Sequence, residues 1–243
     1  MPFTLAHPAA VLPLRGRGLP MPALVTGAMV PDSPQLLGLS QRDDSHSLLG
    51  VVTVDLALGV AALVLWYAVF RRPLADLAFD PWRDRLPEQA PMTVTGWLLS
   101  VPALVVGSLT HVTWDLCTHD GWVADRVPPL AASVGGVEVY SVLQFLSSIA
   151  GLALVLWYAR RVLLRLPPGP RKPAPLVGRW ALISVLAWAA LSGMLVAALL
   201  APYGFEAAMY YLAVTPILAL GFGLTCLCLW WQLVRLARGV RRS

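Results

Sequence analysis

The chain has 243 residues, of which 58% are hydrophobic and only 13% are charged, and its mean hydropathy is +0.69. Soluble globular domains carry about 25% charged residues, so these values exclude a soluble domain and indicate an integral membrane protein. The net charge is +5. The sequence has no basic groove interleaved with aromatic residues, so we expect no nucleic-acid partner. The expected partner is membrane lipid.

The chain begins with two apolar segments, 3–14 and 21–30, that are too short to cross a bilayer, since crossing takes about 20 residues. Prolines and arginines interrupt this region, so it fits neither a cleavable signal peptide nor a spanning helix. We expect short non-spanning helices within an N-terminal segment, 1–47. The first span should follow directly, with Asp44 or Ser45 as its N-cap.

Five later segments are long and apolar enough to span a membrane. They are 48–70, 96–117, 140–162, 180–201 and 207–234. The predicted fold class is therefore all-α, a polytopic membrane helix bundle of about five transmembrane helices plus the short N-terminal helices. We expect it to form a single integral membrane domain, 1–243.

The basic residues predict how the bundle is oriented, because Lys and Arg accumulate in cytoplasmic loops. Fourteen of the 18 lie in or beside the loop 71–91, in or beside the basic linker 163–179, or in the C-terminal tail. With five spans, the N-terminus is then outside and the C-terminus cytoplasmic. This orientation puts all four histidines on the extracytoplasmic side, although no histidine was used to choose it.

His111 and Asp115 are four residues apart on the expected second span. This spacing puts both side chains on one helix face, where they could hold the same metal ion. His119 continues the spacing, but Gly121 indicates that the helix ends nearby. A polar pair that packs within the bundle is the alternative, and the spacing alone leaves both open.

Further His and Asp residues are expected on the same side. Asp32 follows Pro31 in an expected turn, where a structural role and a ligand role both stay open. His46 directly precedes the first span, and helix capping does not explain a histidine there. His7 lies in the first short helix. Asp55, inside the first span, should face the bundle interior and could orient a ligand histidine.

The expected third span carries polar residues at helical spacing near its outer end. They are Tyr140, Gln144, Ser147 and Ser148. Small polar residues of this kind commonly hold membrane helices together, and this is the interpretation that the pattern favours.

Several of these motifs together resemble a known family. They lie at residues 1–8, 27–32, 45–50, 111–122 and 143–148. The chain resembles the uncharacterised bacterial membrane-protein family called domain of unknown function 4184, over nearly its whole length. The resemblance implies a bacterial inner-membrane protein.

More distantly, the order of an early His, Pro-Asp, His-Ser and His-x-x-x-Asp is similar to that of bacterial inner-membrane-associated proteins described as metal-dependent hydrolases. That similarity implies the ligand candidates His7, Asp32, His46, His111 and Asp115. Those hydrolases usually have another histidine shortly before the His-Ser pair. The segment 41–44 has none here, which argues against a two-metal site.

The leading hypothesis is a membrane-bound metal-dependent hydrolase that acts on an ester or phosphoester at the extracytoplasmic face. Mixed His and Asp ligands fit a divalent metal, with zinc expected and manganese or iron also compatible. Asp44 or Asp120 is the expected catalytic acid–base group. Trp114 and Trp122 flank the site and suggest a lipid-linked substrate.

The alternative is a non-catalytic membrane protein, in which the His and Asp residues form a structural metal site or a polar network. A catalytic metal site keeps one coordination position open, whereas a structural one is filled by protein ligands. The sequence does not distinguish the two. A transporter is disfavoured because the last two spans hold almost no ionisable residues.

Overall fold

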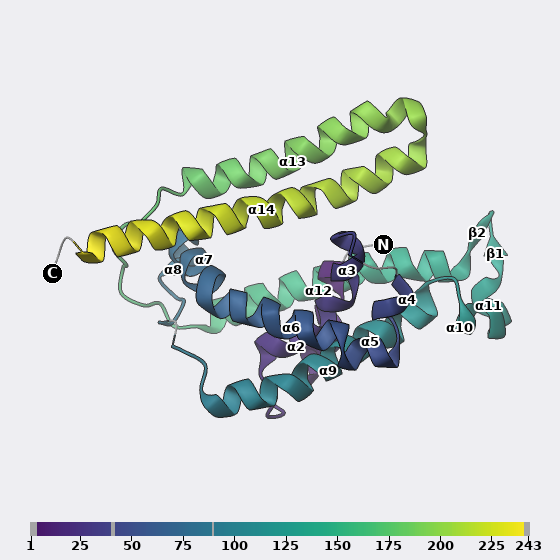
Figure 1. Ribbon diagram of the computed structural model, residues 1–243, viewed down its shortest axis with the longest axis horizontal. Helices are drawn as coiled ribbons and strands as arrows, with labels where there is room; N and C mark the ends of the chain where they lie inside the picture. Colours follow the sequence, from purple (N-terminus) through teal and green to yellow (C-terminus); the bar gives the residue numbers. More distant parts are fainter. Residues whose placement is uncertain (1–3, 40–41, 89, 241–243) are drawn as a thin grey trace. The chain divides into compact units, whose positions relative to one another are not determined.

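The computed structural model describes residues 4–39, 42–88 and 90–240. Parts of the predicted N-terminal segment, residues 1–3 and 40–41, lie outside this range. The described chain is mostly helical, with one short two-stranded hairpin (Figure 1). Five helices in it are long and apolar enough to span a membrane: Leu48–Leu77, Val94–Thr118, Val139–Arg165, Trp180–Tyr203 and Ala207–Gly239. The predicted all-α fold class and the five spans are confirmed.

The chain divides into two compact units, of which the first comprises residues 1–64 and 91–165. Its elements are η1 (Thr4–Ala6), α1 (Pro8–Val11), η2 (Leu12–Leu14), α2 (Met21–Met29), η3 (Val30–Asp32), α3 (Ser33–Leu36), α4 (Arg42–Ser45), α5 (Leu48–Val52), α6 (Val54–Leu65), α9 (Val94–Thr118), α10 (Trp122–Arg126), α11 (Pro128–Ala131), β1 (Ser133–Val134), β2 (Val137–Glu138) and α12 (Val139–Arg165). The segments 4–14 and 21–29 form short helices, as the sequence predicts. Helix α6 continues for one residue into the second unit.

Close packing between α2 and α9 organises the first unit. A Cβ atom added at Gly27 would lie 2.3 Å from the carbonyl oxygen of Leu104, and one added at Gly107 would lie 2.4 Å from that of Leu24. Ser108 Oγ donates a hydrogen bond to the Gly27 carbonyl at 3.1 Å. Small residues commonly let membrane helices approach to backbone contact in this way. The short helix α2 is therefore fixed against the second span.

The start of the first span differs from the predicted one. Ser47, rather than Asp44 or Ser45, is the N-cap of α5, and its hydroxyl accepts a hydrogen bond from the Gly50 amide at 2.9 Å. Asp44 and Ser45 instead belong to the preceding turn of helix, α4. A Cβ at Gly50 would lie 2.2 Å from the Asp44 carbonyl oxygen, so this turn folds tightly onto the start of α5.

The second span, α9, begins at the N-cap Thr93, whose hydroxyl accepts from the Gly96 amide at 3.1 Å. It ends at the C-cap His119, shortly before Gly121, which has a φ of 141°. A two-stranded hairpin, β1 and β2, then leads into α12. Gly135 and Gly136 form its turn with φ angles of 62° and 84°, which suit a two-residue hairpin turn.

The second unit comprises residues 65–90 and 166–243. Its elements are η4 (Trp66–Phe70), α7 (Arg71–Leu77), α8 (Asp80–Arg83), α13 (Trp180–Leu200), η5 (Ala201–Tyr203) and α14 (Phe205–Val240). Helices α13 and α14 run side by side as a hairpin (Figure 1). The division into two units does not test the prediction of a single membrane domain, which stays a prediction.

A polar network in the second unit joins the two basic loops. Asp76 accepts hydrogen bonds from Arg83 at 2.7 Å, from the Leu176 amide at 2.9 Å and from Trp231 Nε1 at 2.8 Å. Lys172 Nζ donates to the Arg83 carbonyl at 2.7 Å. The loops 71–91 and 163–179 therefore lie at the same end of this unit, as expected if both face one side of the membrane.

Candidate metal centre

Four buried side chains of the first unit form a compact cluster. Asp32 ends η3, His46 lies between α4 and α5, and His111 and Asp115 project from α9. One donor atom from each lies within 4.8 Å of every other. The exposed fractions of the Asp32, His46, His111 and Asp115 side chains are 8%, 7%, 0% and 5%, so the cluster is shielded from solvent.

The spacing of the donor atoms fits a single metal ion. His46 Nε2 lies 3.7 Å from Asp32 Oδ1 and 3.2 Å from Asp115 Oδ2. His111 Nε2 lies 3.5 Å from Asp32 Oδ1 and 3.6 Å from Asp115 Oδ2. In a tetrahedral zinc site with bonds of about 2.1 Å, neighbouring donors lie about 3.4 Å apart. Two carboxylates and two neutral imidazoles would also balance the charge of a divalent ion in a medium of low dielectric constant.

The tautomer of His111 supports this interpretation. Its Nδ1 lies 2.8 Å from the Ala28 carbonyl oxygen, and because a carbonyl oxygen only accepts, Nδ1 carries the hydrogen. When the ring is neutral, Nε2 then presents a lone pair. That atom makes no hydrogen bond to a described residue, yet it faces two carboxylate oxygens. A cation between them, or a proton on Nε2, removes the repulsion between lone pairs.

Supporting residues hold two of the other donors. Thr4 Oγ1 donates a 2.6 Å hydrogen bond to Asp32 Oδ2, which leaves Oδ1 facing the cluster. Burial alone raises the pKa of Asp32, but the close approach of His111 and the hydrogen bond from Thr4 outweigh it and lower the pKa to about 2. Asp32 is thus an ionised carboxylate at neutral pH. The second supporting residue is Ser45, whose Oγ lies 3.1 Å from His46 Nδ1.

His7 lies beside the four-donor cluster and outside it. Its ring stacks on that of His111, with 3.7 Å between centroids, and its Nε2 lies 3.7 Å from Asp115 Oδ1. Burial, followed by the neighbouring His111, lowers the pKa of His7 to about 4. The ring is therefore neutral at pH 7, as a metal ligand or proton acceptor must be.

His119 is also near Asp115 but belongs to a different network. Its Nδ1 lies 3.6 Å from Asp115 Oδ2, and its Nε2 contacts the side-chain amide of Gln144. Since the amide nitrogen only donates, Nε2 accepts and Nδ1 carries the hydrogen. That Nδ1 lies 3.3 Å from Thr118 Oγ1, whereas its distance to Asp115 is too long for a hydrogen bond. His119 is not one of the four clustered donors.

Asp55 is buried on the first span, with an exposed fraction of 1%. Neither carboxylate oxygen makes a hydrogen bond to a described residue, although Asp55 interacts electrostatically with His46, His111 and Asp32. An unpartnered carboxylate at this depth is costly. A cation in the neighbouring cluster would offset that cost. The predicted burial of Asp55 is confirmed, and its role in orienting a ligand histidine stays a prediction.

The two predicted acid–base residues lie apart from these contacts. Asp44 and Asp120 are both exposed, and neither is among the residues that line the cavity next to the cluster. Their catalytic role stays a prediction.

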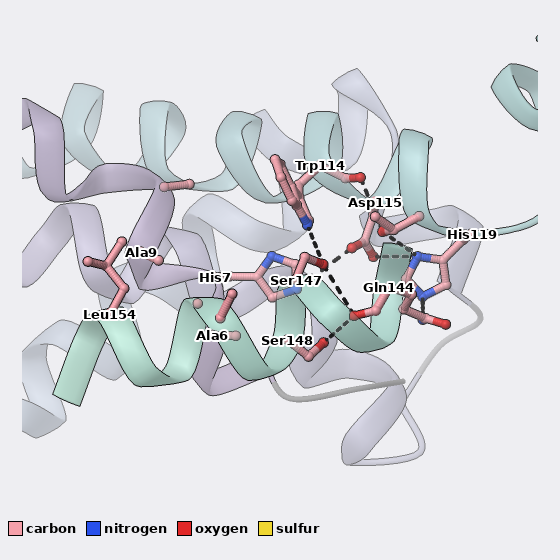
Figure 2. Close-up of a pocket in the computed structure, with 14 residues that line it drawn as sticks. Ala6, His7, Ala9, Trp114, Asp115, His119, Gln144, Ser147, Ser148 and Leu154 are labelled. Carbon is pink, nitrogen blue, oxygen red and sulfur yellow. Dashed lines mark hydrogen bonds and ion pairs between the residues drawn. The ribbon is translucent and has the colours of Figure 1, made fainter. Parts of the chain in front are cut away.

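A cavity of about 310 Å³ adjoins the cluster within the first unit. Its wall is formed by η1, α1, α9 and α12, and it includes His7, Asp115 and His119. Figure 2 shows side chains of α9 and α12 facing one another across it, where Trp114 Nε1 donates to Ser147 Oγ at 3.2 Å. One candidate ligand carboxylate is thus also part of a cavity wall.

Sequence reasoning missed two parts of this arrangement. The stripe Gln144, Ser147 and Ser148 was assigned to helix packing, and Ser147 and Gln144 do contact Trp114 and His119 of the second span. What the sequence did not show is that all three residues also line the cavity. The sequence did carry a signal for this role, because the stripe lies near the outer end of the third span, on the same predicted side of the membrane as His119. Thr4 carried no recognisable signal, since a threonine acquires its role only through its contact with Asp32.

Comparison with known proteins places the chain in a family without a described activity. No curated protein and no solved structure matches it significantly. The family model "Domain of unknown function (DUF4184)" matches residues 1–229. The match covers nearly the whole chain, including every residue of the cluster and of the cavity. The protein therefore belongs to the DUF4184 family.

Proposed function

We propose that this protein is a membrane-bound metal-dependent hydrolase that cleaves an ester or phosphoester at the extracytoplasmic face. The observation that supports it most is the buried set of two imidazoles and two carboxylates, with imidazole-to-carboxylate distances of 3.2–3.7 Å. Asp32, His46, His111 and Asp115 are the proposed ligands, and zinc is the proposed ion. His7 is a candidate fifth ligand.

A divalent ion held by these residues would lower the pKa of a bound water to about 7 and polarise the substrate ester. Asp115 and His7 both line the cavity, so a substrate in it would lie against the cluster. His7, neutral at pH 7, is placed to accept a proton there. Asp44 and Asp120 stay candidates for the same role from the exposed side.

A structural metal site is the second candidate, and one observation favours it. Four protein donors already fill a tetrahedral site, as in zinc sites that only stabilise a fold. The adjoining cavity favours the catalytic alternative, because a purely structural site needs no space beside one of its ligands.

The test is metal content followed by activity. Detergent-purified wild type should contain stoichiometric metal, and Asp115→Asn should lose it, while Asp125→Asn, which alters an exposed carboxylate on α10, should keep it. The metal-loaded protein should hydrolyse nitrophenyl esters or phosphodiesters and stop on chelation. A wild type without metal that shows no thermal shift with zinc refutes the metal site. Bound metal without hydrolysis refutes the enzyme and leaves the structural site.

Orientation is tested by cysteine labelling in a variant without Cys117, Cys226 and Cys228. Ser133→Cys, in the exposed hairpin before α12, should react with an impermeant maleimide from outside intact cells. Ala174→Cys, exposed in the basic linker, should react only after the membrane is permeabilised. The reverse pattern would place the histidines on the cytoplasmic side and contradict the proposed location.

A further inference from the structure

The cavity changes in character along α12. At one end it is lined by Gln144, Ser147 and Ser148, and at the other by Ala150, Gly151 and Leu154. From Gln144 to Leu154 the helix rises about 15 Å, roughly half the thickness of the hydrocarbon core. The polar end therefore lies near the beginning of the third span and the apolar end near its middle.

The cluster adjoins the polar end. Asp115 and His119 line the cavity beside Gln144, and Figure 2 shows these polar groups together, with Leu154 at the opposite end. A ligand that fills the cavity would therefore put a polar group against the cluster and an apolar group at hydrocarbon depth.

Small residues line the apolar end of the cavity. Ala6, Ala9, Ala10 and Gly151 all contribute to its wall, and a Cβ added at Gly151 would lie 3.0 Å from the Ala6 carbonyl oxygen, so the cavity is narrow there. The wall residue Leu154 is 44% exposed, and α12 is a spanning helix of which only 6% of the most apolar window is buried. An apolar chain could therefore enter sideways from the bilayer.

We propose that this cavity binds one acyl chain of a membrane lipid, with the ester or phosphoester of the lipid held against Asp115, His7 and His119. The cleavage of that ester rests on the proposed function, whereas binding of the chain rests only on the cavity. Two features favour a lipid over a soluble ester: the hydrocarbon depth of the apolar end and its opening toward the bilayer.

The test compares two Phe substitutions on the same helix. Ala150 and Ala153 are both exposed, but only Ala150 lines the cavity, at its apolar end. Ala150→Phe should therefore fill that end, whereas Ala153→Phe should not. Both variants and the wild type are reconstituted with a phosphatidylglycerol that carries a photoreactive group in one long acyl chain. After irradiation, labelled peptides from residues 139–165 are quantified.

We expect labelling of this segment to fall about tenfold in Ala150→Phe and to stay unchanged in Ala153→Phe. The fall is expected because the Phe side chain overpacks the apolar end of the cavity. Removing metal with a chelator should leave wild-type labelling in place. Equal labelling of all three proteins overturns the acyl-chain site, even if hydrolysis of short nitrophenyl esters is found. Labelling that follows the prediction in a protein without hydrolysis supports the site and contradicts only the enzyme.

Discussion

Replacing His111 with Ala should lower the zinc affinity of the purified protein by more than about 100-fold, whereas Thr4→Ala should lower it by about 10- to 100-fold. His111 offers Nε2 directly to the cluster, 3.5 Å and 3.6 Å from two carboxylate oxygens. Thr4 acts only through Asp32, whose second oxygen it holds at 2.6 Å. His111→Ala should have the larger effect, because losing a ligand lowers zinc affinity more than losing a residue that only orients a ligand.

Competition with a zinc-sensitive dye in detergent measures both affinities. Asp125→Asn is the matched control and should bind as the wild type does. Because His111→Ala also loses the hydrogen bond to the Ala28 carbonyl, the thermal stability of each apo protein is measured in parallel. If His111→Ala is folded and binds zinc as tightly as Thr4→Ala, His111 is not a ligand.

Gly107→Ala should destabilise the protein by about 1–3 kcal/mol, the usual cost of overpacking, and should also weaken metal binding. The added Cβ would lie 2.4 Å from the Leu24 carbonyl oxygen and 2.7 Å from the Ala28 amide nitrogen. Both are backbone atoms of α2, so no side chain can move aside and the whole helix must shift. A shifted Ala28 no longer holds His111 Nδ1 at 2.8 Å.

Gly221→Ala is the matched control. It is the same substitution in the interior of a long helix, α14, but no heavy atom lies within 4 Å of the added Cβ. It should leave the thermal midpoint in detergent unchanged or slightly higher, since Ala is the better helix former in water by about 1 kcal/mol. If the two variants are equally stable and both bind zinc normally, α2 and α9 do not pack as closely as described.

Local spacing predicted the parts of the site that are local. The His111–Asp115 pair lies on one face of α9, with 3.6 Å between Nε2 and Oδ2. The five spans followed from apolar length alone, because a bilayer demands that length. Asp55 was expected inside the bundle, since hydrocarbon makes an outward carboxylate costly, and it is buried.

The remainder depends on contacts between distant segments. Asp32 reaches His111 because Gly27 and Gly107 let two helices touch, and no local pattern identifies which glycines meet. The predicted N-cap of the first span, Asp44 or Ser45, was wrong. The N-cap is Ser47, because Asp44 and Ser45 form a separate turn of helix. His119 has the spacing of a ligand, but it lies outside the four-donor cluster, and its Nε2 contacts Gln144, a residue from another span.

The sequence positions of the four clustered donors determine when during synthesis a complete metal site can form. Asp32 and His46 precede the first span, whereas His111 and Asp115 lie near the end of the second. During synthesis the first pair leaves the ribosome while the second is still untranslated, so no ion can be held by all four until residue 115 has been made. An ion bound afterwards would tie residue 32 to residue 115 and close a loop that includes the entire first span. Metal capture would then be a late step of biogenesis that locks the inserted N-terminal half in place.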